Sequence, residues 1–161
     1  MMPAPPKIWK ATDVHTLATW HSLQIVVWKQ APTVTALTDV YKATEALLVH
    51  HPDGVAVLGI AQSGMPLIGP EERKLAAAQL KDFGARMKCL CSVIEGDGFW
   101  AGATRSVMTA IMMVARPPCP VKTFARVDEA AAWQAPLLGP SISPALYLRA
   151  VAEVRQARVV G

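Results

Sequence analysis

Apolar and polar residues are distributed along the chain in a pattern that predicts alternating strands and helices. Residues 14–20 and 23–28 each have the character of an extended strand, and the two residues between them match the length of a hairpin turn. Residues 55–61 form a short, continuous apolar run between turn residues, which is typical of a strand buried on both faces. Residues 89–94 predict the next strand.

Helices are predicted in the intervals around these strands. The first follows Pro32, and its apolar residues recur at helical spacing as far as Leu48. The second begins at Pro70, where the two glutamates that follow suit the positive end of the helix dipole. The third runs from about residue 99 to residue 115, where an Arg-Pro-Pro sequence ends it. Its buried side is expected to carry Trp100, Ala103, Val107, Ala110, Ile111 and Val114.

The last third of the chain predicts one more strand and two helices. Residues 121–127 alternate as a half-exposed strand does, and Asp128 is expected to cap a short helix that Pro136 ends. A final helix is predicted over residues 144–158. The element order is therefore ββαβαβαβα with a C-terminal helix, which is an α/β fold with a mixed sheet of about five strands.

Composition and length fit one domain with a large core. Of the 161 residues, 52% are hydrophobic and 17% are charged, against about 25% charged residues in typical domains. We expect a Pro-rich, loosely held segment at 1–13, the α/β domain at 14–138 and a C-terminal helical extension at 139–161. The apolar runs are too short for a transmembrane segment and the N-terminus lacks the apolar core of a signal peptide, so a cytoplasmic protein is expected.

Charge and cysteine usage narrow the possible partners. The net charge is +4, but the basic residues are scattered, so no nucleic acid partner is expected. Cys89 and Cys91 lie two positions apart on a predicted strand, too close for an ordinary disulfide, and we expect buried, reduced thiols. The histidines and cysteines lack the spacing of zinc ligands, so no metal site and no cofactor are predicted.

Two local features, together with the element order, carry a resemblance to a known family. Ser63 and Gly64 follow the strand at 55–61, and Pro120–Phe124 leads into the sequence Asp128–Trp133. With this order of strands and helices, the chain resembles the STAS domain, the fold of anti-sigma-factor antagonists and SpoIIAA-like proteins. The resemblance covers residues 14–136 and lies mainly in topology and element length.

The resemblance implies a regulatory role and one modification site. In that family a partner kinase phosphorylates the hydroxyl of the Ser-Gly or Thr-Gly pair, which makes Ser63 a possible phosphorylation site. The chain departs from the pattern because Ala61 and Gln62 occupy the stretch where the family has an aspartate. It also places five residues between Gly64 and the next helix, whereas that helix begins almost at once in the family.

The function expected on this basis is that of a non-enzymatic, protein-binding module in a bacterial signalling or partner-switching pathway. Methionine and arginine are common in protein interfaces, and the third helix places both on one stripe with Ala101. This stripe is either covered by the C-terminal helix or open to a partner, and the low charge content favours a homodimer or other homo-oligomer. The expected partner-binding residues are Gly64, Met65, Leu67, Ile68, Trp100, Arg105, Met108 and Met112.

Two alternatives remain open from the sequence. The first is a module that binds a small molecule or lipid, since the apolar residues 65–68 could flank a cavity. The second is a small enzyme that uses Glu95, Asp97 and Arg105, because the two carboxylates follow a strand at the end where α/β folds often bind ligands. A polar turn in which Asp97 caps the third helix explains the same residues without catalysis, and no catalytic residue is assigned.

Overall fold

The computed structural model of the chain describes residues 4–159. Its centre is a mixed sheet of six strands that lie side by side in chain order. The first three strands pair antiparallel, and the pairs from β3 to β6 are parallel. The strands are β1 Lys7–Ala11, β2 His15–Trp20, β3 Leu23–Trp28, β4 Val55–Ala61, β5 Met87–Ile94 and β6 Val121–Phe124.

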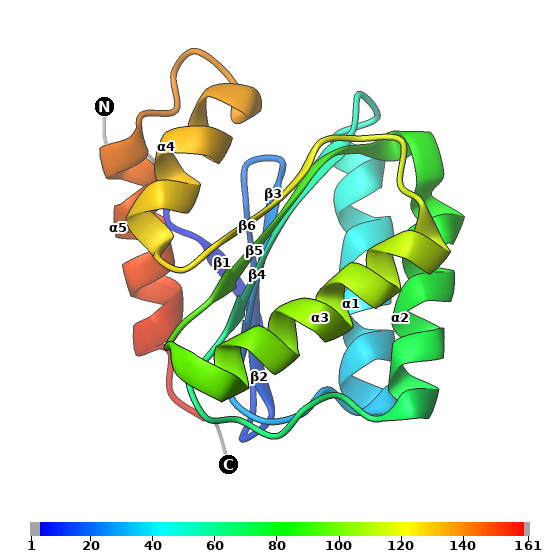
Figure 1. Cartoon of the computed structure of the whole chain (residues 1–161). Coiled ribbons are helices and arrows are strands. Elements are labelled where there is room, and N and C mark those ends of the chain that lie inside the picture. The colour runs from blue at the N-terminus through cyan, green and yellow to red at the C-terminus, as the bar shows by residue number, and fades with distance from the viewer. Residues whose placement is uncertain (1–3, 160–161) are drawn as a thin grey trace.

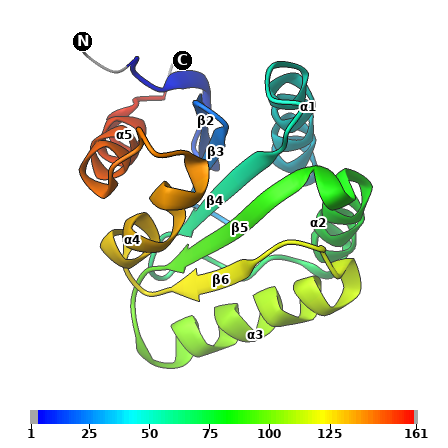
Figure 2. The ribbon, with the colours of Figure 1, turned by 90° about the horizontal axis from the view of Figure 1, so that it is seen from above.

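Helices cover both faces of the sheet, which gives three layers (Figures 1 and 2). The three crossovers between parallel strands all advance the same way across the sheet, and such connections are right-handed, so their helices share one face. These helices are α1 Val34–His50, α2 Pro70–Phe83 and α3 Gly98–Ala115. The opposite face is covered by α4 Val127–Leu138 and α5 Pro144–Gln156.

The general α/β class and the hairpin between the first two predicted strands are confirmed. The N-terminal segment differs from the expectation, because residues 7–11 form an edge strand instead of a loosely held stretch. Two indoles hold this segment in place. The Trp9 side chain donates to Thr19 Oγ1 at 2.9 Å, and the Trp20 side chain donates to the carbonyl of Ala4 at 3.1 Å.

The buried side predicted for α3 is right for Ile111 and wrong for Ala110 and Val114. Its buried residues are Ala101, Thr104, Ile111 and Ala115, whereas Ala110 is exposed and Val114 is 66% exposed. Apolar residues occur on every side of this helix, so several helical stripes fit the sequence and spacing alone does not select one. Although α3 is the longest helix, no helix in residues 4–159 is long and apolar enough to cross a membrane.

The last two helices form part of the same core. Pro136 does not end α4, which continues to Leu138, because a proline in the last turn removes only one hydrogen bond near the helix end. Helix α5 packs against α4, β2 and β3 and buries Tyr147 and Val154 completely. It therefore lies on the sheet face opposite α3 and does not cover the methionines of that helix.

A buried polar network fastens α4 and α5 to the sheet. The Gln134 side-chain amide donates to the carbonyl of Val57 at 3.0 Å and to Cys89 Sγ at 3.5 Å. The Tyr147 hydroxyl donates to Gln134 Oε1 at 2.5 Å, and burial raises the pKa of this phenol. Cys89 and Cys91 are buried and unpaired on this face, as the sequence predicted, and burial raises the pKa of Cys91 to about 12.

Removal of the Tyr147 hydroxyl tests this network. Tyr147→Phe leaves the buried Gln134 oxygen without a donor, so we expect the free energy of unfolding in urea to fall by about 1–3 kcal/mol. The matched control is the same change in a Gln134→Met background, where no amide oxygen remains and Tyr147→Phe is expected to be neutral or stabilising. An equal loss in both backgrounds would show that the hydroxyl does not act through Gln134.

Candidate functional site

A cavity of about 150 Å³ lies between the sheet and the face covered by α1, α2 and α3. It is located where β4 and β5 end, beside the loop that connects β4 to α2. This is the edge of a parallel sheet at which α/β folds bind their ligands. All three helices and both strands contribute to its lining, which is almost entirely apolar.

The floor of the cavity is formed by small residues at the centre of the sheet. Gly59 on β4 pairs in register with Ser92 on β5, and both keep partial exposure although strands flank them on each side. A Cβ atom placed on Gly59 would meet nothing within 4 Å. The backbone of Gly59 has no positive φ that would require glycine. The missing side chain therefore leaves open space above the sheet.

The walls come from one face of each helix, and the largest share comes from α3. Thr104, Met108 and Ile111 of this helix line the cavity, and Leu37 of α1 and Leu80 of α2 stand around them. These are positions at helical spacing on α3, so a single stripe of that helix faces the space.

The methionine stripe predicted on α3 is only partly covered, because Met108 and Met112 also line a shallow hollow beside β6. Ala101 is 1% exposed, and Met108 lines the cavity. Met112 packs on the cluster that contains Leu47. Only Arg105 of the predicted stripe is exposed. The residues of the stripe do recur at helical spacing, but most of them lie on the side of α3 that faces the other helices.

The loop from residue 62 to residue 69 covers one end of the cavity. Its carbonyls are held from two helices, because the Trp100 indole donates to the Met65 oxygen at 2.5 Å and Arg73 Nε donates to the Ile68 oxygen at 3.0 Å. Met65 and Ile68 line the cavity, as does Leu67, a residue that is also 42% exposed. The structure thus brings these predicted loop residues and Trp100 together around the cavity.

Ser63 and Gly64, the pair that carries the family resemblance, lie at the start of this loop and are both exposed. The Ser63 hydroxyl packs against Gly96, where an added Cβ would come within 2.5 Å of Ser63 Oγ. Gly64 has a φ of +79°, which glycine adopts without strain. The hydroxyl therefore points to the loop after β5 and is accessible from solvent.

The three residues of the enzyme alternative, Glu95, Asp97 and Arg105, do not form a common site. Glu95 forms an ion pair with Arg155 of α5 at 2.7 Å, and both side chains are about one-third exposed. Asp97 precedes α3 without a side-chain cap hydrogen bond, and Arg105 is exposed two turns into the helix. Within residues 4–159, no ion pair joins Glu95 or Asp97 to Arg105.

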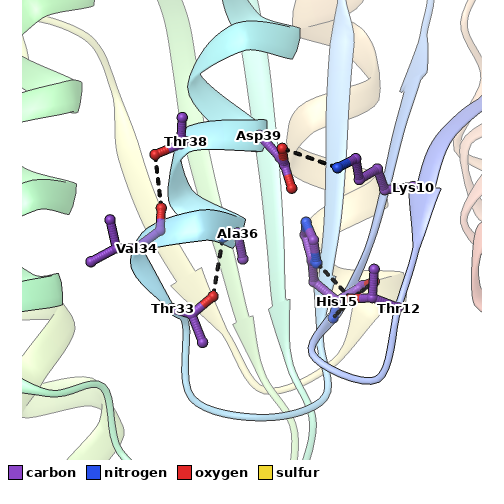
Figure 3. A network of polar contacts seen from close by, with 8 residues as sticks. All are labelled: Lys10, Thr12, His15, Thr33, Val34, Ala36, Thr38 and Asp39. Atoms are coloured by element: carbon purple, nitrogen blue, oxygen red, sulfur yellow. Dashed lines mark hydrogen bonds and ion pairs between the residues drawn. The ribbon is translucent and has the colours of Figure 1, made fainter.

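A buried histidine behind the cavity wall was not singled out from the sequence. His15 is 1% exposed, and its ring stacks on Trp28, a lining residue, with 5.4 Å between ring centroids. Figure 3 shows the ring between Thr12, whose Oγ1 is 3.0 Å from Nδ1, and the ion pair of Lys10 with Asp39. Nε2 has no hydrogen-bond partner in the described part of the chain. The signal that could have identified this histidine is the register of the hairpin, which places His15 opposite Trp28.

Burial lowers the pKa of His15 below its ordinary value. Asp39 acts in the opposite direction and raises this pKa, while Lys10 and Lys29 lower it further. The neutral imidazole is thus the form that the folded protein favours at neutral pH.

Comparison of the chain with protein-family models, curated proteins and solved structures found no match. The STAS-like resemblance stays a prediction that rests on element order, on the pair Ser63–Gly64 and on Pro120–Phe124 with the following sequence Asp128–Trp133.

The titration of His15 predicts how stability depends on pH. As pH falls below 6.5, the unfolded chain binds a proton at this histidine before the folded chain does, so the free energy of unfolding decreases. The slope from one histidine cannot exceed about 1.4 kcal/mol per pH unit. His15→Phe keeps a ring against Trp28 without a titrating group and is expected to reduce the slope between pH 7.5 and 5.5.

The control for this measurement is His51→Gln, because burial also lowers the pKa of His51. Each replacement is expected to reduce, by its own amount, the slope of the urea unfolding free energy against pH. A His15→Phe protein with the same slope as the unaltered protein would show that His15 titrates alike in both states.

Proposed function

We propose that this chain is a binding module for a small apolar molecule, which occupies the cavity between the sheet and α1, α2 and α3. The observation that carries the proposal is the open space above Gly59 at the centre of the sheet. Glycine inside a strand lowers stability by roughly 0.5–1 kcal/mol relative to alanine, and it often marks the close approach of a ligand.

The opposite face of β4 shows that the sheet can be packed tightly here. Ala56, Leu58 and Ile60 point to α4 and α5 and are completely buried. On the cavity side, Gly59 and Ala61 keep partial exposure although three helices cover this face. The difference between the two faces of one strand supports a space that is left for a ligand.

The size of the cavity supports a compact ligand. A cavity of about 150 Å³ lined by leucine, isoleucine and phenylalanine is large enough to bind benzene. The cavity beside Gly59 has a similar volume and a similar apolar lining. A molecule with one ring or a short branched chain therefore fits it, and a complete phospholipid is too large.

A second candidate function is the protein docking expected from the STAS resemblance, and one residue favours it. Phe99 is 93% exposed in the first turn of α3, directly before Trp100, which anchors the loop. Phenylalanine is enriched in protein interfaces relative to the rest of the surface. The homodimer expected from the composition would bury this residue against a second copy of the chain.

Filling the cavity tests the first proposal. Gly59→Ala and Gly59→Val place side-chain atoms in the open space in two steps, and we expect each to raise the melting temperature and to weaken binding of toluene. Gly102→Ala is the matched control, because Gly102 is exposed on α3 with nothing within 4 Å of an added Cβ. It is expected to stabilise the protein by about 1 kcal/mol and to leave toluene binding unchanged.

The readout is the shift of amide resonances, and of the melting temperature, when toluene is added. If the Gly59→Val protein binds toluene as tightly as the unaltered protein does, the toluene site lies elsewhere. An unaltered protein that binds no apolar probe of this size would contradict the proposed function.

Replacement of Phe99 tests the second candidate. Phe99→Ser removes an exposed side chain, so we expect unchanged stability and loss of self-association in sedimentation velocity at micromolar concentration. Leu137→Ser, an exposed apolar residue on α4, is the control and should leave association unchanged. A protein that sediments as a monomer with Phe99 in place would contradict a homodimer through this residue.

A further inference from the structure

One hydroxyl group stands in the apolar floor of the cavity. Ser92 lies on β5 between Leu90 and Ile94, which share its face of the sheet and are both buried apolar residues. Its register partner is Gly59, so the Ser92 side chain stands next to the open space that the glycine leaves. A valine or isoleucine would suit the same strand position better if the space only needed an apolar surface.

This hydroxyl has no protein partner, in contrast to the other hydroxyl of the lining. Thr104 donates to the carbonyl of Trp100 at 2.9 Å. No hydrogen bond joins the Ser92 hydroxyl to another residue of the part that the structure describes. Solvent reaches the Ser92 hydroxyl when the cavity is empty, because this residue is half-buried and its oxygen is not among the buried atoms that lack a partner. An occupant that displaces this water without replacing its hydrogen bond is destabilised, so the cavity favours a ligand that bonds to Ser92.

The lining carries no formal charge. Among the described residues that line the cavity, none is a lysine, arginine, histidine, aspartate or glutamate. On the adjoining helix α2, Arg73 donates from Nε to the carbonyl of Ile68. A carboxylate or phosphate inside the cavity would be buried without a counter-ion, which costs several kcal/mol.

We propose that the ligand is an uncharged, compact molecule with one hydrogen-bonding group, which pairs with the Ser92 hydroxyl while its apolar body fills the space above Gly59. Phenols and cyclic alcohols have this chemistry. This inference rests on the proposed function of the cavity. It assigns Ser92 as the residue that selects a neutral polar group and thereby excludes fatty acids and phosphorylated headgroups from the cavity.

Three probes that share a ring and a methyl group test the ligand class. These are p-cresol, toluene and p-toluate, which carry a hydroxyl group, no polar group and a carboxylate. With the unaltered full chain, p-cresol is expected to bind roughly 3- to 10-fold more tightly than toluene, the effect of one net hydrogen bond. No binding of p-toluate is expected at pH 7. Affinities are measured from amide resonance shifts in the labelled protein.

Ser92→Ala isolates the contribution of the hydroxyl group. This variant is expected to bind toluene as well as the unaltered protein does and to bind p-cresol no better than toluene. The matched control is Ser106→Ala, because Ser106 is exposed on α3 and bonds only within its own helix, to the carbonyl of Gly102. It should keep the full preference for p-cresol. Gly59→Val should weaken the binding of both neutral probes.

The outcomes separate the two levels of the proposal. Equal binding of toluene and p-cresol, or a preference that survives in Ser92→Ala, overturns the role of Ser92 and leaves the apolar binding function intact. Preferred binding of p-toluate overturns the neutral ligand class. Failure of all three probes to bind the unaltered protein overturns both this inference and the proposed function.

Discussion

The structure depends on how differently the two faces of strand β4 are packed. On one face, three side chains from Ala56 to Ile60 are sealed by α4 and α5, and the Gln134–Tyr147 network fixes these helices in position. On the other face, α1, α2 and α3 surround Gly59 and leave the space above this residue unfilled.

The volume of the cavity is large enough to affect the stability of the domain. Empty core volume costs about 24 cal/mol per Å³ in measured substitutions, so a dry, closed space of about 150 Å³ would cost about 3.6 kcal/mol. Domains of this size are stable by only about 5–15 kcal/mol. The ligand that we propose would offset this cost. The loop held by Trp100 and Arg73 covers one end of this space, and no charged residue lines it among the described residues.

The sequence allowed the central strands, the helix order and the apolar loop at 65–68 to be predicted, because buried runs and proline positions are local signals. The possibility of a cavity beneath that loop could be raised for the same reason. The orientation of α3 could not be derived, since apolar residues surround that helix. The position of His15 depends on its cross-strand partner Trp28, and the strand at 7–11 depends on indoles that reach distant backbone and side-chain groups. Such pairings are set by tertiary contacts.

The central claim is that the space above Gly59 is a real, accessible cavity, and a crystal structure determined under xenon pressure tests it most directly. Xenon enters apolar cavities of about this volume. We predict a xenon atom between Gly59 and Met108, with the backbone of the loop at 65–68 unchanged. A crystal structure in which Met65 or Ile68 fills that space, and in which no xenon binds there, would contradict a ligand cavity in this protein.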